Sequence, residues 1–226
     1  SGDAGMSIFS GSGSGDSGNI FFADGTSGSD PVRGGITYKH DDNSLIFRVD
    51  DSPTVTLDSS HNMIFDNSGS GVYLGVTSAA ASNLLDDYEV GTFTPTLATT
   101  GTNFSSIGYA TQTGEYVKVG DLVIAHARVT LNSLTAGSPT GNAVVSGLPF
   151  TSKDTTDMAS SIGFVSNINF DISSFGTIDV GATTSANNTR VSLTRTRNSG
   201  TADGVPHQAV TSSSTDINLV AIYKTA

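Results

Sequence analysis

Short apolar runs recur about every nine residues between positions 19 and 76, and this spacing constrains the fold more than any other feature of the sequence. Polar segments such as HDDNS (40–44) and DSSHN (58–62) separate the runs. Asp, Asn and Ser favour turns because they tolerate a left-handed φ or bond to their own backbone. The pattern predicts a pseudo-repeat of short β-strands at Asn19–Phe22, Gly35–Lys39, Leu45–Val49, Thr54–Leu57, Met63–Phe65 and Val72–Leu74.

Strands of this length that carry one apolar face are not stable on their own. Three identical chains wound about a common axis can bury those apolar side chains against one another, while the turns face solvent. We therefore interpret residues 19–76 as an intertwined trimeric β shaft. A homotrimer is the expected assembly.

Two segments of different composition flank this region. Residues 1–18, SGDAGMSIFSGSGSGDSG, are rich in Gly and Ser and are predicted to form a flexible segment. Within 77–87, TSAAASNLLDD, Ser78 is placed to cap a helix through the alanines, and Leu84 and Leu85 supply a small apolar face. We expect residues 77–91 to be a short helical connector.

From position 92 onward the apolar runs become longer. In the second half of Tyr116–Leu131, Val and Ala alternate at odd positions from 123 and end at Leu131, while Ile124, His126, Arg128 and Thr130 point the other way. Roughly seven or eight strands with frequent turns predict that residues 92–226 form a β-sandwich head of jelly-roll type. The expected fold class is therefore all-β. The other predicted strands are Thr92–Leu97, Asn142–Ser146, Ser160–Val165, Phe175–Val180, Arg190–Thr196 and Asp216–Tyr223.

The net charge of −11 disfavours some classes of partner. The first 90 residues contain 3 basic and 13 acidic residues, so they carry −10 of this charge. Nucleic acids and anionic membranes require a basic surface, so we expect neither as a partner. The sequence has no apolar run of about 18 residues, which argues against membrane insertion. It also has no Cys, and therefore no disulfide or thiolate zinc site.

Candidate catalytic groups are few. Asp86, Asp87 and Glu89 are close in sequence, but a glycosidase needs two carboxyl groups that face each other across a bond, so we interpret them as solvated connector residues. The four histidines are scattered, and zinc needs three or four convergent ligands. His126 is expected to be exposed, although three symmetry-related copies near a trimer axis would leave a metal or anion site open as an alternative. We expect no enzymatic activity, no cofactor and no metal.

The basic residues of the second half concentrate in RVSLTRTRNSG (190–200), which a polar loop follows. One interpretation is a solvated strand end. The other is a ligand rim, because arginine binds carboxylate and phosphate groups through two parallel hydrogen bonds. The residues predicted to bind a receptor are Arg195, Arg197, Asn198, Asp203, His207 and Gln208.

The shaft region resembles the shaft repeats of tailed-bacteriophage tail-fibre proteins. The similar stretches are GNIFFADGTSG (18–28), GGITYKHDDNSLIFRVD (34–50) and LDSSHNMIF (57–65). LLDDYEVGTFTPTL (84–97) is similar to the junction that enters their C-terminal heads, and TGEYVKVGDLVIAHARVTL with GLPF (147–150) is similar to early head strands. The similarity covers residues 19–150. His61 departs from it, because the family usually has Gly in this turn.

The resemblance implies a homotrimeric receptor-binding protein at the distal end of the virion's tail fibre. Its partner would be a host cell-surface receptor, either a glycan or an outer-membrane protein. Two other functions remain open: a polysaccharide depolymerase whose carboxylates meet only between subunits, and a purely structural virion spike or bacterial adhesin.

Overall fold

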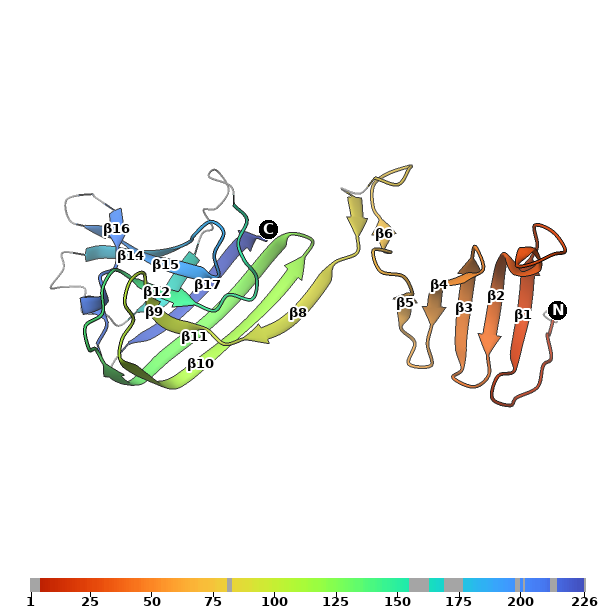
Figure 1. Cartoon of the computed structure of the whole chain (residues 1–226), viewed down its shortest axis with the longest axis horizontal. Coiled ribbons are helices and arrows are strands. Elements are labelled where there is room, and N and C mark those ends of the chain that lie inside the picture. Colours follow the sequence, from red (N-terminus) through yellow and green to blue (C-terminus); the bar gives the residue numbers. More distant parts are fainter. Residues whose placement is uncertain are drawn as a thin grey trace, which may run out of the picture. The chain divides into compact units, whose positions relative to one another are not determined.

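The computed structural model of the chain describes residues 5–80, 83–154, 163–168, 177–197, 200, 202–211 and 215–225. The chain divides into two compact units, Ser1–Asp86 and Asp87–Ala226, which we call the shaft unit and the head unit (Figure 1). Regular structure in the described residues is antiparallel β-strand, with short 3-10 turns such as Asp30–Val32 and no α-helix. The all-β prediction is confirmed.

The shaft unit contains a five-stranded sheet in which every strand pairs with its neighbour along the chain (Figure 1). Its strands begin within two residues of their predicted positions, because the polar turn sequences fix where each strand must stop. The strands are β1 (Ser17–Phe22), β2 (Gly34–Lys39), β3 (Ser44–Val49), β4 (Ser52–Leu57) and β5 (Met63–Phe65).

The turns of this sheet use residues with a left-handed backbone. Asp50 and Asp51 lie between β3 and β4 with φ values of 55° and 58°, as a two-residue type I′ hairpin turn requires. His61 has a φ of 67° in the turn between β4 and β5, a backbone conformation that Gly adopts at the least cost. Asp58 supports this turn, because its carboxylate accepts hydrogen bonds from the backbone N–H groups of Ser60 and Asn62.

The structure contradicts the helix predicted over residues 77–87, because the described residues of this segment form no α-helix. Leu84 and Leu85 form strand β7 (Leu84–Leu85), which pairs with β6 (Val72–Tyr73). Helix propensity is a weak preference that tertiary pairing overrides. Residues 88–91, also assigned to the connector, belong to the head strand β8 (Tyr88–Phe93), which pairs with β10 (Ser106–Val119).

The described strands of the head unit form one open hydrogen-bonded path in the order β8-β10-β11-β17-β13-β14-β15-β12-β9, and β16 pairs with β15. Parts of two predicted strands, residues 160–162 and 175–176, lie outside the described residues. The remaining strands are β9 (Thr96–Thr99), β11 (Leu122–Thr135), β12 (Ala143–Ser146), β13 (Gly163–Ile168), β14 (Thr177–Thr184), β15 (Arg190–Arg197), β16 (Ala202–Gly204) and β17 (Asp216–Lys224).

The head sheet folds over itself into a sandwich. Strands from both halves of the path supply one apolar core: Val129 of β11 and Leu219 of β17 belong to the same buried cluster as Val145 of β12 and Leu193 of β15. Figure 1 shows β10, β11 and β17 running together behind β12, β14 and β15. A jelly roll has two separate sheets, whereas here a single path supplies both layers.

The predicted alternation of β11 is confirmed, because its odd-numbered residues from Val123 to Leu131 are all buried. However, the run Tyr116–Leu131 is a hairpin rather than one strand. Gly120, with a φ of 57°, reverses the chain between β10 and β11. The sequence does not indicate the start of β10 at Ser106, because residues 106–115 contain few apolar side chains.

Candidate functional site

One face of the shaft sheet is apolar across all five strands. Ile20, Ile36, Phe47, Val55 and Phe65 lie opposite one another in the strand register and form a continuous row. The adjacent row on the same face consists of Gly18, Tyr38, Leu45, Leu57 and Met63. We call these two rows, with Phe22 and Val49 at their margin, the shaft face.

The shaft face is incompletely covered by the chain itself. Phe47, in the middle of its row, is 41% exposed, and Val49 is 64% exposed. Ile8 of the N-terminal segment lines a hollow of about 270 Å³ with Ile20, Ile36 and Leu45, which covers one corner only. Contiguous exposed apolar surface of this kind is typical of interaction sites, so the shaft face is a candidate contact surface.

A second exposed apolar surface lies on the outside of the β8-β10-β11-β17 layer of the head. Val90, Val117, Ile124 and Ile222 lie opposite one another on these four strands. Tyr88, Val119 and Leu122 form the next row toward the β10–β11 turn. A hollow of about 540 Å³ opens on this surface and is lined by Val90, Val117, Ile124, His126 and Val220, among others. This apolar surface could have been inferred from the sequence, since Leu122 and Ile124 place apolar side chains on the exposed face of β11.

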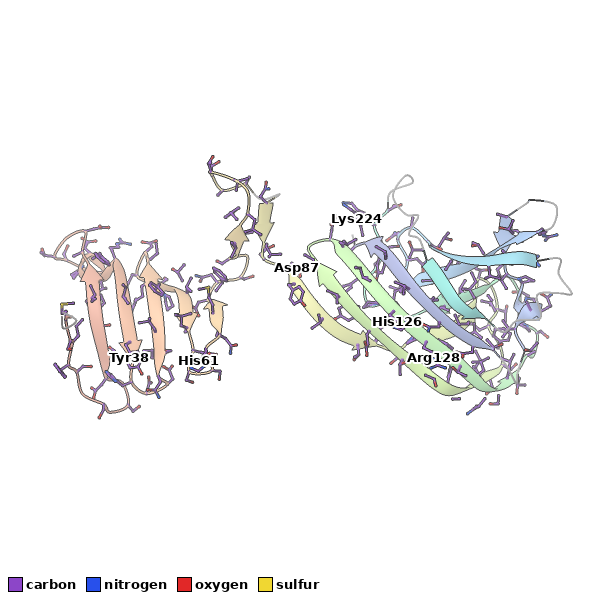
Figure 2. All side chains as sticks on the ribbon, turned by 180° about the vertical axis from the view of Figure 1, so that it is seen from behind. Tyr38, His61, Asp87, His126, Arg128 and Lys224 are labelled. Carbon is purple, nitrogen blue, oxygen red and sulfur yellow. The ribbon has the colours of Figure 1, made fainter. Side chains whose placement is uncertain are left out.

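The same outer surface becomes polar farther along the strands. His126 is exposed, as predicted; its Nε2 atom lies within hydrogen-bonding distance of Asn218 Oδ1, and Glu115 is its cross-strand neighbour on β10. Arg128 pairs with Asp216 at 3.3 Å between Nη2 and Oδ2, and Thr130 donates a hydrogen bond to the same carboxylate. Figure 2 labels His126 and Arg128 on this surface. Opposite charges are therefore neighbours here.

The predicted receptor site is partly an internal ion-pair cluster. Arg195 Nε donates to Asp203 Oδ1 at 2.7 Å, and Arg197 Nε donates to Asp203 Oδ2 at 2.8 Å, across the β15–β16 hairpin. The side chain of Arg195 is only 6% exposed, whereas that of Arg197 is 46% exposed. Arg195 thus supports the hairpin rather than facing a ligand, and Arg197 is the arginine that solvent reaches.

The other predicted receptor residues are not all brought together. His207 begins the 3-10 turn His207–Ala209, and its Nδ1 atom lies 2.8 Å from the carbonyl oxygen of Gly141. Gln208 is exposed in the same turn. Asn198 lies outside the described residues. Arg195, Arg197 and Asp203 therefore form one cluster, while His207 and Gln208 belong to a separate turn that packs beside Gly141.

Asp203→Asn is expected to destabilise the head unit in a pH-dependent way. Hydrogen bonds from Arg195, and then from Arg197, lower the pKa of Asp203 below its ordinary value. The stabilisation from this carboxylate is complete above the ordinary carboxyl pKa and is lost as the pH falls through the lowered pKa of the folded state. In thermal unfolding, the difference between wild type and variant should therefore be largest near neutral pH and shrink in acid. The exposed Asp86→Asn control should track the wild type. A difference that is constant with pH would contradict this linkage.

Of the three connector carboxylates expected to be solvated, Asp86 is exposed, whereas Asp87 and Glu89 are hydrogen-bonded to the head unit. Asp87 accepts a hydrogen bond from Lys118 Nζ, and Glu89 accepts one from the Tyr116 hydroxyl. The bond to Glu89 raises the pKa of Tyr116. Lys118 also lies over the Phe150 ring, with Nζ 5.5 Å from the ring centre. Figure 2 labels Asp87, where the head unit begins. Sequence reasoning missed this cluster because its partners are far apart along the chain.

In the part of the chain that the structure describes, no three His, Asp or Glu side chains converge in a way that could hold a metal ion. Nor does that part contain a helix of the length and apolar character needed to cross a membrane. No protein family description matches the chain, and searches of curated proteins and of solved structures each found no similar protein.

Proposed function

We propose that the chain is the distal part of a tailed-bacteriophage tail fibre, a homotrimer that attaches the virion to a receptor on the surface of a host bacterium. The observation that carries this proposal is the shaft face, whose apolar rows extend over five strands while Phe47 at their centre stays exposed. A sheet of this kind is suited to packing against further copies of itself. The resemblance of residues 19–150 to tail-fibre shafts and head junctions supports the same assignment.

Assembly would determine how the head binds. A trimer presents three heads, so weak contacts to a repetitive cell surface combine through their effective concentration and give strong overall attachment. A rigid sandwich is a suitable support, because its loops can vary while its core stays fixed.

Within each head we assign receptor contact to the solvent-accessible members of the predicted site. Arg197, His207 and Gln208 offer hydrogen-bond donors and acceptors, as sugar hydroxyls require. Arg195 and Asp203 hold the hairpin that carries Arg197. The chain contains no Trp to stack on sugar rings, so polar contacts would have to provide the specificity.

The proposal is tested by measuring the adsorption of the fluorescently labelled chain to a panel of bacterial strains. We expect saturable binding to a subset of strains that excess unlabelled chain displaces. Arg197→Ala combined with Gln208→Ala should weaken binding at least about tenfold, since a hydrogen bond to a charged group contributes about 1.5–3 kcal/mol. Lys153→Ala removes an exposed positive charge elsewhere and is the matched control.

Different outcomes would overturn different parts of the proposal. Binding to no strain would favour a purely structural spike. Release of reducing sugar ends from host glycan would establish a depolymerase. Unchanged adsorption by a correctly folded double variant would move the receptor site away from Arg197 and Gln208.

A further inference from the structure

The outer surface of the head changes character along its strands. The end beside the β10–β11 turn is apolar, and we call this part the head patch; its members are Tyr88, Val90, Val117, Val119, Leu122, Ile124, Val220 and Ile222. The following rows carry Glu115, His126, Arg128 and Asp216. One surface thus combines an apolar half with a polar half.

The head patch includes an edge strand. In the described sheet β8 ends the strand order, and on it Tyr88 is 68% exposed and Val90 is 58% exposed. Proteins normally protect an edge with charged residues, Pro or a covering segment. The outward-facing side chains of β8 at these two positions carry no charge, so this edge has the composition of a covered surface.

The charge and position of the head patch favour a second copy of this chain as its partner. The chain has a net charge of −11, but the two rows nearest the β10–β11 turn carry a single charged side chain, that of Lys224, which lies opposite Leu122. The neighbouring Lys224 pairs with Asp121 at 3.2 Å, so two copies can approach here without strong repulsion between like charges. The patch also adjoins the start of the head unit, since the backbone N–H of Gly120 donates to the carbonyl oxygen of Asp87. Copies joined through their shaft faces would hold this end of their heads at high effective concentration.

The numbers of residues on the shaft face and on the head patch are also consistent with contacts between copies of this chain. Stable interfaces involve about 20–30 residues on each side. The head patch alone contributes eight residues, which is too few, but with the twelve residues of the shaft face the total reaches the lower limit of that range. An assembly of identical chains supplies a partner of the same kind for each of the two surfaces.

We propose that the head patch packs against the head of another copy of this chain, so that the heads contact one another at their connector end while their polar rows remain hydrated. This inference rests on the homotrimer proposed above. It adds that the heads are joined to one another and are not independent binding modules on a common shaft.

Thiol labelling in the full chain tests this contact, because the chain has no cysteine of its own. Val117→Cys and Thr113→Cys are a matched pair: both positions are exposed, lie on β10 and point to the same outer surface. A water-soluble maleimide should label position 117 at least about tenfold more slowly than position 113, since a covered thiol reacts only when the interface opens. Light scattering on the same samples gives the number of copies.

Each outcome decides between the proposals. Slow labelling at position 117 alone, in an oligomer, supports the head contact. Equal rates in an oligomer overturn the head contact and leave the proposed shaft assembly intact. A monomer, at any labelling rate, overturns both. Protection of position 117 that appears only after host cells are added would assign the head patch to the receptor, and would also overturn the contact between copies.

Discussion

Phe47→Asp is expected to abolish assembly of the chain. Phe47 lies at the centre of the shaft face, between Ile36 of β2 and Val55 of β4, and a partner copy would bury what the single chain leaves exposed. Removing a buried Phe side chain costs about 3–5 kcal/mol, and each copy of the assembly would incur this loss. An unpaired carboxylate in an apolar interface adds a desolvation penalty. Light scattering should therefore change from the mass of an oligomer to that of one chain.

Two further variants separate assembly from folding. Phe47→Leu keeps an apolar side chain and should retain the oligomer. Ile46→Asn introduces polarity at the adjacent position of β3, whose side chain points to the opposite face of the sheet, and should also retain it. If Phe47→Asp stays fully oligomeric while Ile46→Asn dissociates, the contact face has been assigned to the wrong side of the sheet.

Asp87→Ala is expected to destabilise the head unit strongly, although it changes a residue at the very start of that unit. Its partner Lys118 has a side chain that is only 11% exposed, so the substitution leaves a nearly buried ammonium group without its carboxylate. Breaking a buried ion pair by removing one partner costs about 3–5 kcal/mol, and we expect the low end of that range because Asp87 itself is 45% exposed. Urea unfolding followed by tyrosine fluorescence is a suitable measurement, since Tyr116 and Tyr223 lie close to this cluster and the chain has no Trp.

A compensating substitution checks the mechanism. Adding Lys118→Met to Asp87→Ala removes the unpaired charge and keeps a side chain of similar length, so most of the lost stability should return. Equal stability of the single and double variants would contradict a charge-based explanation. Truncation before residue 92 should be more damaging than either, because it also removes most of β8 from its pairing with β10.

The sequence predicted those parts of the fold that local chemistry determines. The strands of the shaft unit could be placed because each turn carries residues suited to a left-handed φ, such as Asp50 and Asp51. The buried face of β11 could be predicted from its alternation. The false helix at 77–87 arose because the pairing of Leu84–Leu85 with Val72–Tyr73 has no local signal.

The contacts within the candidate site could not be predicted, because they too depend on strand pairing that has no local signal in the sequence. The three residues of β16, Ala-Asp-Gly, are too short and polar to indicate a strand, so the ion pair between Asp203 and Arg195 could not be predicted. Similarly, 31 residues separate Lys118 from Asp87. Ion pairs depend on which strands become neighbours, and only the three-dimensional structure establishes that.

The chain-order pairing of β1 to β5 has a consequence for the order of folding. Sheets built from neighbouring hairpins have low contact order and close quickly, because little loop entropy opposes each step. The head unit has a higher contact order. Its strand β11 pairs with β17, so that residues as distant in sequence as Arg128 and Asn218 lie opposite each other. The shaft sheet can therefore form first within each chain, in a step independent of protein concentration. Association would then be a separate, concentration-dependent step between sheets whose strand register is already set.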